Sequence, residues 1–224
     1  MAALHSAGAL ATHALCVSEA PTTVLLLAIA YVCGSIPTGV LLSRRRGVDP
    51  RDIGSGNIGA TNVARAAGVT TGVLTLVGDV LKGLVPVVLA LRSGCAAPTE
   101  ALTGLAAFFG HLYSCFLGFQ GGKGVATALG VSLGLSPLAT AIVVPVFVVT
   151  AALSRYVSLA SLVGALTLPP VVIVLGYPPA TVVASFVMAA MITIRHRDNI
   201  RRLRHGTESR IGGLDVSRAD SGVA

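Results

Sequence analysis

One stretch of the sequence, FQGGKGVAT at 119–127, has residue types and spacing that suit an anion. Three glycines surround Lys123, so backbone N–H groups would lie beside a cation with no side chains in the way. We expect a helix to begin near Val125, and its N-terminus would direct a positive dipole at the same place. This combination favours phosphate, although it does not match a Walker A loop. A flexible turn between two helices explains the spacing equally well.

A second stretch, RDIGSGNIGATNVAR at 51–65, is rich in glycine and small polar side chains. Its glycines allow a close backbone approach or a positive φ. Arg65 adds a positive charge one helical turn after Thr61, if this part of the chain is helical. The set suits phosphate oxygens or a hydroxyl-bearing substrate, and the alternative is a capped helix start after a loop. Its neutral donors and acceptors are Ser55, Asn57, Thr61 and Asn62.

The third stretch, RHRDNIRRL at 195–203, contains His196 and Asn199 three positions apart. On a continuing helix the two side chains share a face. His196 could act as a base, as an acid or as a hydrogen-bond donor to phosphate. The surrounding arginines are equally typical of the cytoplasmic end of a membrane span. Glu208 lies too far along the chain to be placed by helical periodicity.

Other ionisable residues are assigned supporting roles. Asp79 and Lys82 lie three positions apart inside an apolar segment, where they can pair with each other. We interpret this pair as structural support and His111 as a packing histidine. The four cysteines form no C-x-x-C pair and the acidic residues are scattered, so no metal site is predicted. The HExxH motif is also missing from the sequence.

Long apolar segments separate these polar stretches. The chain of 224 residues is 54% hydrophobic and 11% charged, and its mean hydropathy is +0.83. Its apolar runs do not alternate with polar residues as membrane barrel strands do, so we predict an all-α, polytopic membrane helix bundle. No Lys or Arg precedes Arg44. The first apolar run is therefore expected to be a retained span rather than a signal peptide.

Breaks at serine, glycine and proline predict seven transmembrane helices. Merging the last four segments into two longer spans would give five. Arginines cluster near the first loop and near the C-terminus, so the positive-inside rule puts the N-terminus outside and the C-terminus in the cytoplasm. The count of seven also puts SRYVSLAS, at 154–161, on the cytoplasmic face with the other polar loops. The predicted spans are 22–43, 72–91, 101–119, 125–135, 138–153, 157–175 and 180–194.

Two other functional classes fit the sequence less well. A transporter for an anionic solute would be expected to show inverted repeats, whereas only a faint likeness joins GNIGATNVARAAGV to GGKGVATALGV. A membrane phosphatase or phosphotransferase would need a cluster of acidic metal ligands. Nucleic-acid binding is not expected, because no aromatic residues alternate with the arginines.

The sequence strongly resembles the bacterial PlsY family of acyl-phosphate-dependent glycerol-3-phosphate acyltransferases. The likeness runs from residue 34 to 208. We therefore expect one integral membrane domain over residues 1–208, with an extra segment at 1–20, and a disordered polar tail at 209–224. The matching stretches are GSIPTGVLLS, RDIGSGNIGATNVAR, GDVLKG, GHLYSCF, FQGGKGVATALGV, SRYVSLAS and RHRDNIRRLRHGTE.

The resemblance implies an activity and a fold. Family members transfer a fatty acyl group from acyl phosphate to the 1-hydroxyl of glycerol 3-phosphate, the first step of phospholipid synthesis. The products are lysophosphatidic acid and inorganic phosphate. Seven helices cross the bacterial plasma (inner) membrane, the site faces the cytoplasm, and no cofactor or metal is needed. The expected partners are the two substrates and the lipid bilayer, with the soluble enzyme that supplies acyl phosphate as a further candidate.

The resemblance also implies roles for individual residues. Ser55 and Arg65 correspond to an essential serine and arginine, and His196 and Asn199 to an essential histidine and asparagine. Gln120 departs from the family, which often has a basic residue there. The remaining residues expected to bind substrate or phosphate are Gly56, Asn57, Thr61, Asn62, Gly121, Gly122, Lys123, Gly124, Ser158 and Glu208.

Such a reaction would have to bring two anionic substrates together. Cations and backbone donors would offset their repulsion and orient them. No Ser-His-Asp triad is evident, so we expect direct attack without an acyl-enzyme. The base is either His196 or a phosphate oxygen of the substrate, and the resemblance favours the substrate.

Overall fold

The computed structural model describes residue 21 and residues 23–212. Expectations for the segment 1–20, and for the tail beyond residue 212, concern residues outside this range. Within the described residues every regular element is a helix and no strand occurs. The prediction of an all-α protein is confirmed for this part of the chain.

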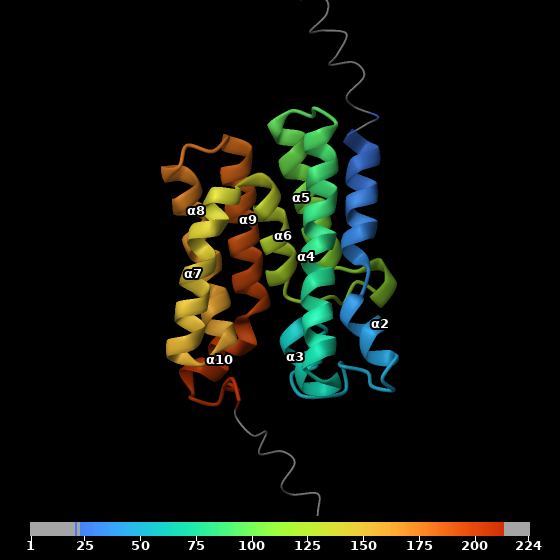
Figure 1. The fold of residues 1–224 in the computed structure, drawn as a ribbon, viewed down its shortest axis with the longest axis vertical. Coiled ribbons are helices and arrows are strands. Elements are labelled where there is room, and N and C mark those ends of the chain that lie inside the picture. The colour runs from blue at the N-terminus through green and yellow to red at the C-terminus, as the bar shows by residue number, and fades with distance from the viewer. Residues whose placement is uncertain (1–20, 22, 213–224) are drawn as a thin grey trace, which may run out of the picture.

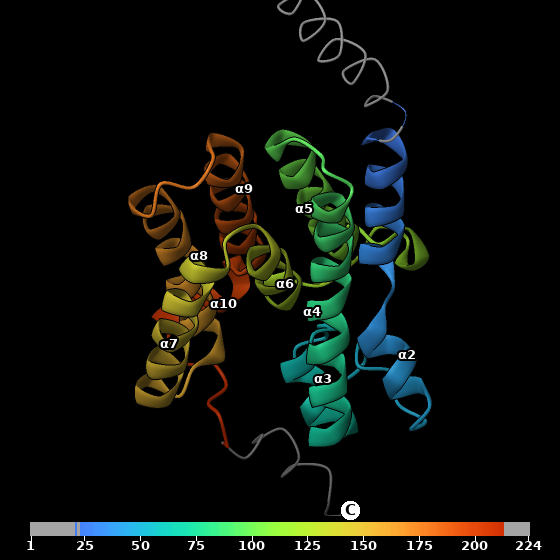
Figure 2. The same ribbon diagram turned by 45° about the horizontal axis from the view of Figure 1, so that its top comes forward.

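The helices run roughly along one direction and form two groups, one with α4 and α5 and the other with α7, α8 and α9 (Figures 1 and 2). Helix α6 packs against α4, α5, α7 and α9, and so joins the groups. After a first helix at 23–35, the elements are α2 (Thr38–Arg44), α3 (Ala60–Ala67), α4 (Val69–Arg92), α5 (Ala97–Leu112), the 3-10 helix η1 (Cys115–Leu117), α6 (Val125–Leu135), α7 (Pro137–Ser154), α8 (Val157–Val174), α9 (Pro179–Arg195) and α10 (Arg197–Arg204).

Most predicted boundaries are confirmed. Separate helices meet at all three breaks predicted in the second half of the chain, and α6 begins at Val125. The third segment, expected to reach residue 119, instead ends at Leu112, because Tyr113 leaves the helical conformation with a φ of −128° and a ψ of 63°. The first segment is interrupted at Ile36 and Pro37. Proline supplies no backbone N–H, which explains this second difference.

Four described helices are long and apolar enough to cross a membrane: Thr23–Arg44, α4, α7 and α8. Helix α9 contributes to a fifth when it is counted with α10, from which it is bent by 58°. Helix α6 is apolar but has only 11 residues. Large apolar side chains such as Val24, Leu153 and Val174 are exposed on the outside, as lipid-facing surfaces require. The chain is therefore a multi-pass helical membrane protein, while the count of seven spans stays a prediction.

Helices α4 and α6 approach closely because glycines face the partner backbone. A Cβ atom added at Gly83 would meet the carbonyl oxygen of Thr127, and one added at Gly130 would meet that of Val80. Small residues let membrane helices come this close, and van der Waals packing then holds them together. The contact fixes α6, whose N-terminus directly follows the glycine loop, residues 118–124.

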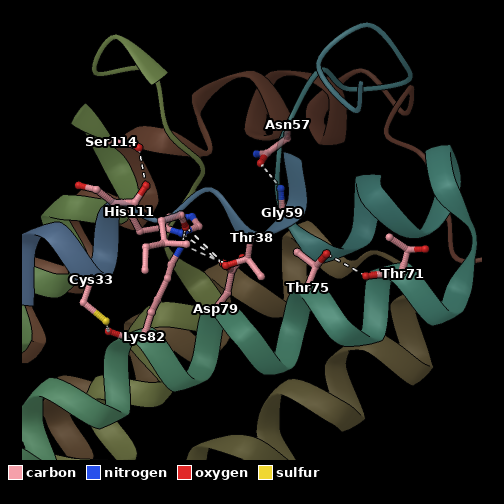
Figure 3. A network of polar contacts seen from close by, with 12 residues as sticks. Cys33, Thr38, Asn57, Gly59, Thr71, Thr75, Asp79, Lys82, His111 and Ser114 are labelled. Atoms are coloured by element: carbon pink, nitrogen blue, oxygen red, sulfur yellow. Dashed lines mark hydrogen bonds and ion pairs between the residues drawn. The ribbon is translucent and has the colours of Figure 1, made fainter. Parts of the chain in front are cut away.

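A buried polar network supports the break in the first membrane segment (Figure 3). Lys82 donates from Nζ to the carbonyl oxygen of Ile36 at 2.9 Å and lies 2.8 Å from Asp79 Oδ1. The side chain of His111 is also buried, with Nδ1 3.9 Å from the same carboxylate oxygen. The predicted pairing of Asp79 with Lys82 is confirmed. The pair positions the Lys82 ammonium group so that it donates to the carbonyl oxygen of Ile36 at the helix break.

We expect Gly130→Ala to destabilise the protein, because the added methyl group forces α4 and α6 apart. Overpacking costs about 1–3 kcal/mol, more than the gain of about 1 kcal/mol in helix propensity. Gly164→Ala in α8 is a matched control, since its Cβ would meet Phe147 and Val143 atoms only at 3.7 Å. The midpoint of thermal unfolding in detergent should fall for the first variant and stay or rise for the second. Equal midpoints would contradict the close contact.

Candidate active site

The glycine loop is held against the end of α5 by its own backbone. Gly121 N–H donates to the carbonyl oxygen of Leu112, and Gly122 N–H to that of His111, both at 3.1 Å. A Cβ atom at Gly122 would collide with the imidazole of His111. The expectation that these two N–H groups are open to an anion is therefore wrong, because close packing uses them within the protein. The first-turn N–H groups of α6 have no partner within the helix and can still face an anion.

Arg195, at the end of α9, binds the same loop from another side. Its Nε donates to the carbonyl oxygen of Gly122 at 3.1 Å, and its Nη2 to that of Gly121 at 2.7 Å. Its guanidinium carbon lies 6.0 Å from the centre of the Tyr113 ring. From the sequence, Arg195 was interpreted only as a marker of the cytoplasmic end of a span. Its position next to His196, in a stretch that matches the family, could have indicated that it belongs to the site.

Lys123 begins a series of polar contacts that joins the glycine loop to α10. Its Nζ donates to Asn199 Oδ1 at 2.5 Å, and Asn199 Nδ2 donates to Glu208 Oε1 at 2.6 Å. Arg202 Nε donates to Glu208 Oε2 at 2.7 Å. Gly124 follows Lys123 with a φ of 84° and leads directly into α6. The structure thus brings together three predicted site residues that lie up to 85 positions apart, from 123 to 208.

The environment of this cluster changes its protonation. Burial lowers the pKa of Lys123 to about 8, while the nearby carboxylate of Glu208 acts in the opposite direction. Burial alone would raise the pKa of Glu208, but contacts with Ser158, Asn199 and Arg202 hold it below its usual value. The hydroxyl of Ser158 is buried and near this carboxylate. Lys123 and Glu208 are therefore both charged near pH 7.

His196 follows the end of α9, at the bend between α9 and α10. The helix does not continue straight through this point, because it bends by 58° where the apolar sequence of α9 gives way to arginines. His196 and Asn199 are nevertheless both buried. His196 Nδ1 lies 2.8 Å from the carbonyl oxygen of Ile192, which can only accept, so we assign the proton to Nδ1 and leave Nε2 as an acceptor. Burial lowers the pKa of this imidazole to about 4, and the ring is neutral near pH 7.

The GSGN loop, residues 51–59, is organised by Asn62 from α3. Asn62 Nδ2 donates to three backbone carbonyl oxygens at 2.8, 3.0 and 2.9 Å, and its Oδ1 accepts from the N–H of Ser55 at 3.0 Å. The residue is only 2% exposed. Its amide is committed to the loop, so it positions the loop, while the predicted contact with phosphate stays a prediction.

The other predicted residues of this region are more accessible. Asn57 Oδ1 accepts from the N–H of Gly59 at 2.9 Å and shapes the turn before α3. Ser55, Thr61 and Arg65 are exposed. Thr61 and Arg65 are not among the residues that line the cleft between the two loops.

This cleft has a volume of about 440 Å³ and takes its walls from both loops and from α9. Two arginines face it, and arginine binds phosphate oxygens through paired N–H groups. Lys123, His196 and Asn199 do not line the cleft and connect to it through the glycine loop and Arg195. The lining residues are Arg51, Gly56, Ile58, Phe119, Gln120, Gly121 and Arg195.

Comparison with known proteins identifies the family to which this arrangement belongs. A family model described as glycerol-3-phosphate acyltransferase matches residues 24–206. The chain belongs to the glycerol-3-phosphate acyltransferase family. The resemblance stated from the motifs is confirmed.

Relatives in this acyltransferase family cover most of the chain. The glycerol-3-phosphate acyltransferase of Geobacter sulfurreducens is 54% identical over 186 residues, which are 83% of this chain and 96% of that protein. The one of Geobacter metallireducens is 57% identical over 187 residues, which are 84% of this chain and 96% of the relative.

Solved structures of the family share the fold. A crystal structure of PlsY (YgiH), an integral membrane glycerol 3-phosphate acyltransferase, in its glycerol 3-phosphate form is 43% identical and superposes with a TM-score of 0.84. The match covers 88% of this chain and 98% of that one. The lysophosphatidic acid form of PlsY gives a TM-score of 0.81 at the same identity, over 85% and 96% of the two chains.

We expect Asn62→Ala to loosen the GSGN loop, because buried carbonyl groups lose their donor. Each unsatisfied buried group costs about 1–3 kcal/mol. Thr61→Ala, which changes an exposed neighbour on α3, is the control. Trypsin should cut after Arg51 several times faster in Asn62→Ala than in the native protein or the control. Equal cleavage rates in all three proteins would show that Asn62 does not hold the loop.

Proposed function

We propose that this protein transfers a fatty acyl group from acyl phosphate to the 1-hydroxyl of sn-glycerol 3-phosphate, giving lysophosphatidic acid and inorganic phosphate. The observation that carries the proposal is that the GSGN loop, the glycine loop and Arg195 meet around one cleft. The cations of this region suit two phosphate-bearing substrates. The related PlsY structures are of a glycerol 3-phosphate form and a lysophosphatidic acid form, which agrees with this acceptor and product.

We propose seven spans in the bacterial plasma membrane, with the N-terminus outside and the C-terminus and active site on the cytoplasmic side. Figure 1 shows α2, α3 and the arginine-rich α10 toward one end of the bundle. Helix α5 has 16 residues and therefore reaches about 24 Å, less than the hydrocarbon core of about 30 Å. The glycine loop that follows α5 would therefore lie below the membrane surface. The phosphate of an acyl phosphate could then reach this loop while the acyl chain stays in the bilayer.

The reaction exchanges one acyl–oxygen bond for another and moves one proton. The 1-oxygen of glycerol 3-phosphate attacks the acyl carbon, and the bond from that carbon to the phosphate oxygen breaks. The hydroxyl proton passes to an oxygen of the departing phosphate. We prefer this substrate-assisted route because the lowered pKa of His196 makes it a weak base near pH 7. Arg195 and Lys123 supply positive charge where two phosphates approach each other.

In this mechanism His196 is a phosphate ligand. An anion beside the ring favours the protonated form and so raises the pKa of the imidazole. With Nδ1 already donating to Ile192, the added proton would sit on Nε2 and donate to a phosphate oxygen. Binding of substrate would therefore convert His196 from an acceptor into a donor.

Two residues of the GSGN region are assigned to substrate by family resemblance. The Ser55 hydroxyl is exposed next to Gly56, which lines the cleft, and Asn62 fixes the Ser55 backbone. We propose that this hydroxyl binds one substrate directly. Arg65, exposed on α3, would bind phosphate from the same side.

The proposed activity is tested with purified protein in lipid vesicles. Acyl phosphate and labelled glycerol 3-phosphate should give labelled lysophosphatidic acid, with one inorganic phosphate released per product. Acyl-CoA replaces acyl phosphate in the control and should give none. If acyl phosphate yields no lysophosphatidic acid, the proposed reaction is wrong, and product from acyl-CoA alone would show that the donor is wrong.

Replacing His196 separates the two candidate bases. If His196 only binds phosphate, His196→Gln should raise KM for a phosphate substrate about tenfold, equivalent to about 1.4 kcal/mol, with a smaller effect on kcat. The pH profile of kcat should keep its shape. A large loss of kcat together with loss of the acidic limb of the profile would identify His196 as the base.

The alkaline limb of kcat/KM should report on Lys123. Its lowered pKa of about 8 means that the lysine is charged below pH 8 and loses its attraction for phosphate as the pH rises through 8. We expect kcat/KM for glycerol 3-phosphate to fall about tenfold from pH 7 to pH 9. Lys123→Arg keeps its charge over this range and should flatten the fall. An unchanged alkaline limb in Lys123→Arg would assign the limb to another group.

A further inference from the structure

The chain after α10 turns back and lies against the turn between α7 and α8. We call residues 205–212 the C-terminal strap. Thr207 N–H donates to the carbonyl oxygen of Arg202 at 2.9 Å, which reverses the chain. Further along, Ile211 N–H donates to the carbonyl oxygen of Arg155 at 2.8 Å, and Arg155 Nη2 donates back to the carbonyl oxygen of Ile211 at 2.9 Å. This reciprocal pair fixes the far end of the strap.

A second contact holds the strap beside the first. Arg210 Nε donates to the hydroxyl of Tyr156 at 3.0 Å, and the guanidinium carbon lies 5.4 Å from the centre of the same ring. Both anchoring residues, Arg155 and Tyr156, belong to the turn that joins α7 to α8. The strap is therefore clamped at two neighbouring positions of one turn.

The backbone of this turn is strained. Arg155 adopts a φ of 62°, in the left-handed region that residues other than glycine seldom occupy. Its N–H caps α7 by donating to the carbonyl oxygen of Ala151 at 2.9 Å. A non-glycine residue persists in such a conformation when surrounding contacts hold it there, and such outliers cluster at functional sites. The two hydrogen bonds between Arg155 and Ile211 are contacts that can hold Arg155 in this conformation.

Between its two ends the strap carries Glu208. The side chain of Glu208 is only 8% exposed, although its neighbours on the strap are exposed. It bonds to Asn199 and Arg202, and Asn199 in turn accepts from Lys123. The clamp at Arg155 is thus connected to Lys123 through Glu208 and Asn199.

We propose that Arg155 and Tyr156 are positioning residues, which clamp the C-terminal strap so that Glu208 holds Asn199 and Lys123 in place. Neither residue lines the cleft, so both act through Glu208. The proposal rests on the proposed function for its kinetic consequences. Its structural part, the clamp, stands on the contacts of the strap.

Release of the strap would change the charge around Lys123. Glu208 is the group that most favours the protonated lysine, so loss of its contact while Lys123 stays buried would lower the pKa of Lys123 further. Lys123 would then lose its charge at a lower pH, and phosphate affinity would decline there. The titratable and charged groups that face Lys123 come from α9, α10 and the strap, and are Arg195, His196, Asp198, Arg202 and Glu208.

The clamp is tested with Arg155→Gly. Glycine tolerates a positive φ, so this variant keeps the turn without strain and loses only the side chain that bonds to Ile211. Arg204→Ala, which removes the same charge from an exposed position on α10, is the matched control. Hydrogen exchange of the strap amides and the pH dependence of kcat/KM are measured on the full chain in lipid. Both are repeated with the Glu208→Gln variant and with the Arg155→Gly, Glu208→Gln double variant.

In Arg155→Gly we expect strap amides to exchange at least about tenfold faster. We also expect the alkaline limb of kcat/KM to move down by about half a pH unit. The control should change neither. The double variant should show the same limb as Glu208→Gln alone, because Arg155 acts only through that carboxylate. An unmoved limb in Arg155→Gly, or a further shift in the double variant, would overturn the proposal.

The exchange measurement separates this proposal from the proposed function. If the native protein makes no lysophosphatidic acid, the function fails, while faster exchange in Arg155→Gly both in the strap and around Lys123 and Asn199 still supports the clamp. Unchanged exchange in Arg155→Gly overturns the clamp whether or not the protein is active.

Discussion

Inside a bilayer a carbonyl group has no water to bond to, and the first membrane segment exposes such groups where it breaks at Ile36 and Pro37. Lys82 supplies a donor to one of them and is itself held by Asp79. The carboxylate also lies near His111, whose backbone and ring meet the glycine loop. The need to pair one backbone carbonyl group, that of Ile36, therefore connects the first segment through Lys82 and Asp79 on α4 and His111 on α5 to the loop that carries Lys123.

The main role of Gly121 and Gly122 is to let the glycine loop pack closely against the end of α5. They bring the loop so close to α5 that two of its N–H groups are used there, and Arg195 takes the carbonyl groups on the other side. The positive charge of the site then comes from side chains on separate segments. Because these segments are far apart in the sequence, the cleft depends on the packing of α6 and on the hydrogen bonds of Arg195 to the glycine loop.

Much of the fold follows from local sequence signals. Breaks at Ser136-Pro137, at Ser154-Arg155 and from Gly176 to Pro179 predicted the helix boundaries after residue 124, and the apolar runs predicted that these segments are helices. The end of α5 at Leu112 escaped prediction because the residues after it are still apolar. The role of Arg195 also escaped, since it arises from contacts with a loop more than 70 residues earlier. The role of Asn62 escaped because its partners are backbone carbonyl groups of an irregular loop, which no periodic pattern reveals. Glu208 could be assigned to the site only by resemblance, because helical periodicity ends before the strap.

The order in which the site is completed follows from the position of α9 and the strap in the chain. A ribosome adds about 5–20 residues per second from the N-terminus, so the GSGN loop and the glycine loop are synthesised before α9 and the strap. Until residues 195–208 follow, the carbonyl groups of Gly121 and Gly122 lack Arg195, and Lys123 lacks Asn199 and Glu208. The contacts that hold the glycine loop and Lys123 are therefore complete only after α9 and residues 196–208 have been added to the chain.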